Sequence, residues 1–378
     1  MSECLSAATI LRELVAIPTP SAVSNMPLLR WVEDFLKARG WRVDVLTYAD
    51  EQGVAKGNLL GRPGASEWSG RIELGFVCHT DTVPYASNWG EALKLSERDG
   101  HLHGCGSCDV KGALSCFLAA VAALEDNALA LGCALILTAD EEIGCKGMER
   151  LLREKTLRIQ SAIISEPTSL RPGIAGKGYG LARITIEGKE AHSAFPERGV
   201  SAIAVAAQLI VRIQDRFAGG WETASQDALF DPPRTTVNIG VIEGGTAKNI
   251  IAGHCMFLVE WRALPGESPE YFLGELRSLL EEARQAEPRA AILLEALRAE
   301  AGFAPTTDGP LMRRLAEVLP GPPIGICFGS EASRVARIAE EVIVMGPGDM
   351  QTAHSDRECV PAAELEQWTE ALRRLLTA

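Results

Sequence analysis

The chain has 378 residues, 47% hydrophobic and 23% charged, a composition typical of soluble proteins and enough for two cores. Its net charge of −13 argues against nucleic acid or an anionic membrane as a partner, because both bind basic surfaces. Apolar runs are too short to cross a bilayer, and Met1–Glu3 lacks the basic segment of a signal peptide. The ten scattered cysteines indicate reduced thiols and a cytoplasmic location.

The first 177 residues alternate between helical and strand-like spacing. In chain order we expect helices at 8–16 and 27–37, strands at 42–47 and 72–78, a helix at 112–124, and strands at 134–138 and 162–165. Such alternation favours an α/β sheet with helices on both faces. Ligands of these sheets bind at strand ends.

The pattern changes after Lys177. We expect the order strand, helix, strand, strand, helix, strand, at 180–188, 200–217, 235–242, 256–262, 269–284 and 290–297. This β-α-β-β-α-β order is that of a ferredoxin-like unit. We therefore predict an inserted domain at 178–299, with 1–177 and 300–378 forming the other domain.

Polar clusters follow several of the expected strands. His79 and Asp81 end one strand, and Asp140-Glu141-Glu142 follows another. Further along the chain are Glu166, which follows a third strand, and His354, in a glycine-rich loop. A hydrolytic metal site needs imidazole and carboxylate ligands and one free carboxylate as a base. His79 could bind metal while Asp81 accepts a hydrogen bond from its other ring nitrogen or supports it less directly.

The segment 101–112 allows three interpretations. His101 and His103 could be a metal pair, Cys105 and Cys108 a redox or zinc motif, and Asp109 a ligand between a glycine-rich turn and a helix. The neighbouring glycines favour the third, because they let the backbone approach a site closely. A lone C-x-x-C is a weak signal, and the two histidines are expected to be surface and strand residues.

The clusters belong to a longer set of segments that follow one another in this order: CHTDTVP, HGCGSCDVKG, TADEEIGCKG, SEPTS, EAHSAFPERGVSAI, GGTAKNII, EWRALPG and GPGDMQTAHSDRE. This ordered set resembles the M20 family of dinuclear metallo-hydrolases and covers nearly the whole chain. The resemblance implies a mixed-sheet α/β catalytic domain of the zinc-exopeptidase type. It also implies that the inserted ferredoxin-like α+β domain is a lid through which the chain forms a homodimer.

The resemblance also assigns roles to individual residues. Two divalent metal ions would be bound by His79, Asp109, Glu142, Glu166 and His354, with Asp109 as the bridge. Glu141 would be the general base, Asp81 would hold His79, and His192 would reach a partner's active site. The substrate-binding positions would be Asn249, Arg262, Gly329 and Ser330. Imidazole and carboxylate ligands suit zinc, although cobalt or manganese could serve.

The activity implied is hydrolysis of an N-acyl amino acid, with N-acetylornithine as the leading substrate. Alternatives are N-acetylcitrulline, N-acetyl-lysine, N-succinyl-diaminopimelate and dipeptides or other peptides. Family members often have another residue in place of Cys105, and Thr in place of Ser330, so the substrate is less well defined than the metal chemistry. From other classes, a non-catalytic metal-binding relative and a thiol-disulfide protein remain alternatives; Glu141 argues against the first.

Overall fold

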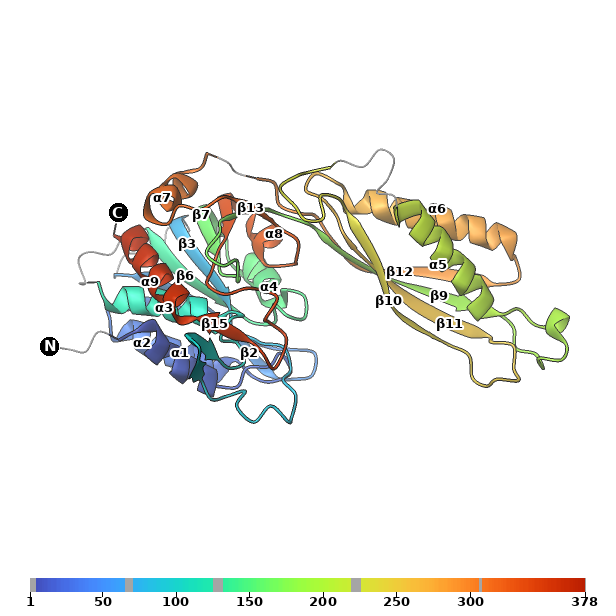
Figure 1. Cartoon of the computed structure of the whole chain (residues 1–378), viewed down its shortest axis with the longest axis horizontal. Coiled ribbons are helices and arrows are strands. Elements are labelled where there is room, and N and C mark those ends of the chain that lie inside the picture. The colour runs from blue at the N-terminus through green and yellow to red at the C-terminus, as the bar shows by residue number, and fades with distance from the viewer. Residues whose placement is uncertain (1–4, 65–70, 125–131, 219–225, 306–307, 378) are drawn as a thin grey trace. The chain divides into compact units, whose positions relative to one another are not determined.

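A computed structural model describes residues 5–64, 71–124, 132–218, 226–305 and 308–377 (Figure 1). The chain divides into two compact units. The first unit comprises Met1–Ile174, Thr306–Ile324 and Ser330–Ala378, and the second comprises Ala175–Pro305 and Gly325–Gly329. The predicted borders, 177/178 and 299/300, did not include the short return at 325–329. The N-terminal segment Met1–Glu3 lies outside the described residues.

A mixed sheet forms the centre of the first unit. Its strands are β1 (Trp41–Ala49), β2 (Ala55–Pro63), β6 (Cys133–Thr138), β3 (Arg71–His79), β7 (Arg158–Ile164), β14 (Ala339–Val344), β8 (Gly173–Gly176) and β13 (Ile324–Ile326), which neighbour one another in that order. The central run β6-β3-β7-β14 is parallel. Its carboxyl ends therefore meet along one edge of the sheet, where a site is expected in α/β folds.

Helices cover both faces of this sheet. The largest apolar core involves α1 (Ala7–Ala16), α2 (Met26–Lys37), α3 (Lys111–Ala122), α7 (Pro310–Val318) and α9 (Ala362–Leu376). The remaining helices of the unit are α4 (Lys146–Glu154) and α8 (Ala332–Val335). A small sheet in the order β15-β5-β4 joins Cys359–Pro361, His101–His103 and Ser96–Arg98. No helix of the described residues is long and apolar enough to cross a membrane.

Strand β2 was not predicted, because its Gly, Asn and Pro residues are typical of loops. The structure explains them by close packing. A side chain at Gly57 would meet Leu29 at 2.8 Å, and one at Gly61 would meet Leu36 at 2.9 Å. Glycine thus lets α2 lie directly on the strand. On the other face, Asn58 donates to the Gly147 carbonyl of α4, as the alternation of side chains in a strand requires.

The second unit has the predicted β-α-β-β-α-β order. Its elements are β9 (Tyr179–Glu187), α5 (Ala202–Ala218), β10 (Thr236–Gly244), β11 (His254–Arg262), α6 (Pro269–Ala286) and β12 (Ala291–Glu300), with a 3-10 turn at Pro196–Arg198. The antiparallel strands lie in the order β10-β11-β9-β12. Both helices lie on one face of the sheet. Burial alternates along β9 and β11, so their apolar side chains form a separate core with the helices.

Candidate active site

Strand ends bring the predicted ligands together in the first unit. His79 is the last residue of β3 and pairs with Thr138, the last residue of β6. Glu142 follows β6, Glu166 follows β7, and His354 lies in the loop after β14. Asp109 lies two residues before Lys111, the first residue of α3. Because β6, β3, β7 and β14 are parallel, these segments leave the sheet at the same edge.

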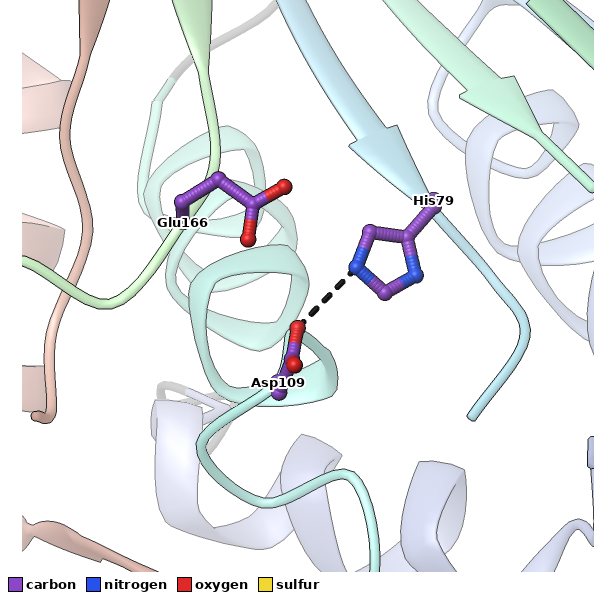
Figure 2. A group of neighbouring side chains, drawn as sticks. All are labelled: His79, Asp109 and Glu166. Atoms are coloured by element: carbon purple, nitrogen blue, oxygen red, sulfur yellow. Dashed lines mark hydrogen bonds and ion pairs between the residues drawn. The ribbon is translucent and has the colours of Figure 1, made fainter. Parts of the chain in front are cut away.

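Asp109 lies between two imidazoles. Its Oδ1 is 3.0 Å from His79 Nε2, and its Oδ2 is 3.1 Å from His354 Nε2. The same His354 nitrogen is 3.2 Å from Glu142 Oε1. Glu166 points toward the pair formed by His79 and Asp109 (Figure 2). All five predicted metal ligands therefore converge.

Among the described residues, two groups have the composition of a metal site. One is His79, Asp109 and Glu166; the other is Asp109, Glu142 and His354. Within each group the donor atoms lie within 4.8 Å of one another. Each offers one imidazole nitrogen and two carboxylates, the ligand types that zinc and related divalent ions accept. The donor set fits two ions that share Asp109.

Charge burial supports the same fit. His79, Asp109 and Glu166 are each at most 5% exposed, and charges this deeply buried need partners. Burial, followed by the charge of Asp109, raises the pKa of Glu166 well above its usual value. Cations in the two groups would stabilise this concentration of carboxylates.

The two histidines already compensate part of this charge. Burial alone would raise the pKa of Asp109, but its hydrogen bonds with His354 and His79 outweigh burial and hold that pKa below the usual value. Conversely, hydrogen bonds to Asp109 and Glu142 raise the pKa of His354 to about 10. The imidazoles thus occupy the carboxylate atoms that a metal ion would bind.

Asp81 supports His79 through its backbone carbonyl and not through its carboxylate. His79 Nδ1 donates to the backbone carbonyl of Asp81 at 2.9 Å, whereas the Asp81 carboxylate is 3.8 Å away. That carboxylate accepts from Ser21 Oγ at 2.7 Å and from the amides of Glu141 and Glu142 at 3.0 and 3.2 Å. Of the two alternatives for Asp81, the structure therefore has the indirect one. Its carboxylate holds the turn that carries the expected base.

Glu141 is partly buried beside the two ligand groups. Burial raises its pKa to about 8, an effect that His79 opposes and the Glu142 charge reinforces. Its Oε1 accepts a hydrogen bond from Cys145 Sγ at 3.2 Å. Glu141 belongs to neither ligand group found among the described residues. The carboxylate is therefore available for proton transfer.

The other interpretations of segment 101–112 receive no support. His101 and His103 are partly exposed residues of β5 and belong to neither ligand group of the described residues. Cys105 and Cys108 are buried and unpaired, and burial raises the pKa of the Cys105 thiol to about 11. A thiol that resists ionisation is a poor redox or metal-binding group. Asp109 is the residue of this segment that reaches the site.

His192 and Asn249 lie on paired loops of the second unit. The backbones of His192 and Ile250 form an isolated β-bridge, and Ser193 N donates to the Asn249 carbonyl at 3.0 Å. Both predicted residues are exposed. His192 Nδ1 accepts from the Ala194 amide at 3.1 Å, and this hydrogen bond does not involve Nε2.

Arg262 and Gly329 are neighbours in the second unit. Arg262 Nε donates to Glu260 at 2.8 Å, and its guanidinium lies 4.2 Å above the Tyr179 ring. A side chain at Gly329 would lie 3.4 Å from Arg262 Nη1. Ser330 belongs to the first unit, is buried, and accepts from the amide of Ala332. The ion pair with Glu260 gives Arg262 a structural partner within the second unit.

Sequence reasoning missed two buried side chains that hold the site's loops. Lys56 forms an ion pair with Asp140 at 2.9 Å, with both side chains 1% exposed. Glu358 accepts hydrogen bonds from the backbone of the loop that carries Asp109. A charged residue that becomes buried by tertiary contacts has no periodicity of its own. The only signal for Lys56 was a lysine within a glycine-rich segment.

Comparisons with known proteins identify relatives of this chain. Residues 75–378 match the model of peptidase family M20/M25/M40. An acetylornithine deacetylase from Myxococcus xanthus is 40% identical over 375 residues, which are 99% of this chain and 98% of that protein. Another, from Photorhabdus laumondii, is 30% identical over 93% of this chain and 91% of its own length.

Solved structures show the same fold. A tripeptidase from Staphylococcus aureus superposes with a TM-score of 0.79 at 20% identity, covering 99% of this chain and 98% of its own. A dinuclear metal-binding peptidase of the M20 family from Bacillus subtilis has a TM-score of 0.67 at 14% identity, covering 98% of both chains. The fold is therefore of the zinc-exopeptidase type.

Proposed function

This chain belongs to peptidase family M20/M25/M40 and is a metal-dependent amidohydrolase, and we propose that it hydrolyses N-acetylornithine to ornithine and acetate. The observation that carries the chemistry is the pair of ligand groups that share Asp109, with Glu141 beside them. The choice of substrate is supported by the full-length similarity to the Myxococcus xanthus protein.

The residues of the first unit have complementary roles in amide hydrolysis. Divalent cations in the two ligand groups would supply Lewis acidity, which polarises the amide carbonyl and makes a water molecule more acidic. Zinc suits these ligands best, although cobalt and manganese also accept them. Glu141 would take the proton of the attacking water at its carboxylate and deliver it to the leaving amine. Asp81 keeps Glu141 and Glu142 in place through their backbone amides.

The second unit would supply substrate recognition. The Arg262 guanidinium, next to Gly329, would bind the free carboxylate of the substrate by charge-assisted hydrogen bonds. Asn249 would add a polar contact, and so would Ser330, which belongs to the first unit. His192, exposed on its loop, would stabilise the oxyanion in the active site of a partner subunit.

The same unit would form a homodimer. Strand β10 is at the edge of its sheet, and its Val241 and Ile242 are exposed. The adjacent helix α5 exposes Ile203 and Val211. An edge strand beside a helix with exposed apolar residues can pair with its own copy about a two-fold axis.

The cysteines of the described residues form no disulfides, which supports the proposed cytoplasmic location.

A substrate panel tests the proposed function. Purified protein would be freed of metal, reconstituted with zinc or cobalt, and assayed on N-acetylornithine, N-acetylcitrulline, N-acetyl-lysine, N-succinyl-diaminopimelate and dipeptides. We expect the highest kcat/KM for N-acetylornithine, loss of activity with a chelator, and unchanged activity after thiol alkylation. A higher kcat/KM for another compound of the panel would make that compound the substrate in place of N-acetylornithine. A metal-loaded protein that hydrolyses none of them would be a non-catalytic relative.

A further inference from the structure

Glu358 is a buried carboxylate near the two ligand groups, and the proposed reaction gives it no chemical step. It is 3% exposed. Its Oε1 accepts hydrogen bonds from the amides of Cys108 and Asp109, both at 3.0 Å, and its Oε2 accepts from the amide of Gly106 at 2.9 Å. These donors belong to the loop that ends in the shared ligand. A carboxylate that accepts several backbone amides holds that backbone in a defined shape.

Glu358 also connects the two chain segments that supply ligands. It lies four residues after His354, and its own carbonyl accepts from the amide of Gly104 at 3.4 Å. The next residue, Cys359, pairs with His103 where β15 joins β5. His354 Nε2 in turn reaches Asp109 Oδ2 at 3.1 Å. The two segments are therefore fastened at the backbone, through Glu358, and at the side chains, through His354.

We infer that Glu358 is a positioning residue for the metal centre, which sets the backbone of the 104–109 loop so that Asp109 can face both histidines. The inference rests on the proposed function, because it assigns Glu358 to the same metal site. Glu358 contacts the ligand's backbone and not its carboxylate, so it acts on metal binding through Asp109. Residues that orient a ligand in this way commonly change metal affinity by about 10–100-fold when replaced.

The first unit contains a matched glutamate for comparison. Glu341 is 1% exposed, and it accepts from the amides of Leu311 and Met312 and from Ser161 Oγ, each at 2.8 Å. As in Glu358, one carboxylate oxygen accepts two hydrogen bonds and the other accepts one. These partners tie β14 to the start of α7 and to β7, and none is a ligand or part of a ligand loop. Glu341 therefore accepts as many hydrogen bonds as Glu358 does, but none of them comes from the loop of a metal ligand.

The test compares Glu358→Gln with Glu341→Gln. Glutamine has the size of glutamate, but its NH₂ group cannot accept a hydrogen bond, so each variant leaves a buried donor without its acceptor. We would titrate metal-free protein with zinc and with cobalt and measure each dissociation constant. We expect Glu358→Gln to weaken metal binding by about 10–100-fold, and Glu341→Gln to leave it within about two-fold of wild type.

A second measurement needs no metal. In the metal-free protein, amide hydrogen exchange should lose protection at Gly106, Cys108 and Asp109 in Glu358→Gln. In Glu341→Gln the loss should occur at Leu311 and Met312 instead. Glu358→Ala removes every acceptor and should lower metal affinity further; if it fails to fold, the glutamine variant still decides the question.

The outcomes separate this inference from the proposed function. A wild-type protein that binds no divalent metal would contradict the proposed function itself. A wild type that binds two ions, with the two glutamine variants equal in metal affinity, would overturn the role of Glu358. Equal loss of affinity in both variants would show a general effect of destabilisation and would also overturn it. Lower affinity in Glu358→Gln alone, with exchange localised at the 104–109 loop, is the expected result.

Discussion

Glu141 allows catalysis and metal binding to be separated at a single side chain. Glu141→Gln retains the size of the side chain and removes its basicity, so metal content should stay near wild type. The hydrolysis rate should fall at least about 10²-fold, because proton transfer by a positioned base contributes about 10²–10⁴-fold. Metal analysis and steady-state kinetics measure both effects. As a control, Glu142→Gln should lose metal, and a near-normal rate for Glu141→Gln would remove Glu141 from the mechanism.

Arg262 has a structural partner and a proposed substrate partner, and kinetics can distinguish them. Arg262→Ala should lower kcat/KM by roughly 10–10²-fold, since a charged hydrogen bond contributes about 1.5–3 kcal/mol. The loss should shrink for a substrate whose carboxylate is amidated, because its partner is then absent.

Arg298 provides the matched control for this prediction. It lies 4.3 Å from the same Tyr179 ring and pairs with Glu300 at 2.8 Å, as Arg262 does with Glu260. Arg298→Ala should therefore remove comparable contacts while changing kcat/KM little. Equal losses for both variants, or for both substrates, would assign Arg262 to the integrity of the second unit alone.

Among the secondary structure elements, β2 has a role in the site that its composition conceals. Lys56 Nζ donates to the carbonyls of Ser21 and Val23 at 2.6 and 2.8 Å, and it forms an ion pair with Asp140 at 2.9 Å. Asp140 has a positive φ of 58°, in the left-handed region that non-glycine residues rarely occupy. The strand thus anchors the turn that places Glu141 and Glu142 after β6.

Breaking this buried pair should be costly. Lys56→Met retains most of the side-chain volume but leaves the Asp140 charge buried, which should lower the free energy of unfolding by about 3–5 kcal/mol. Urea denaturation measures the loss. Lys37→Met removes the exposed pair with Glu33 on α2 and should change the free energy of unfolding little, because solvent screens such a pair. Similar losses for the two variants would show that the Lys56 pair has no special role in stability.

For the whole molecule, the main question is whether each active site of a dimer needs His192 from the other subunit. Glu141→Gln and His192→Ala should each be inactive alone. If His192 acts on the partner's site, mixing the two variants should restore about a quarter of wild-type activity, because half of the dimers are mixed and each has one complete site. Activity measured against mixing ratio checks this, and no restoration would place His192 in its own chain's site or outside the mechanism.

The interface itself can be tested by charge. Val211→Lys and Ile242→Lys place cations on the exposed face of α5 and on the edge strand, where burial against a second copy would be unfavourable. We expect each variant to be monomeric at micromolar concentration by light scattering, with wild type dimeric. Lys248→Ala, on an exposed loop of the same unit, should leave the dimer intact. A fully active wild-type monomer would contradict the dimer.

Local patterns in the sequence were sufficient for the elements with regular apolar spacing. The helices and strands of the second unit, from β9 to β12, were predicted in the right order, because alternation and helical spacing depend only on neighbouring residues. The order of segments around His79, Asp109, Glu141 and His354 was sufficient for the family. Strand β2 was missed because its glycines are needed for close packing against α2. That contact is tertiary, so no pattern of neighbouring residues in the sequence indicates it.

Which atoms meet was decided by the tertiary structure. The Asp81 carboxylate accepts hydrogen bonds from the amides of Glu141 and Glu142, and its backbone carbonyl accepts one from His79. These contacts form because β3 and β6 pair side by side. Glu358 reaches the amide of Gly106 across 252 residues of sequence, and no periodicity extends over such a separation. The chemistry of each ligand is a property of its side chain. Its partners depend on the free energy of packing the whole chain, which brings distant segments to one edge of the sheet.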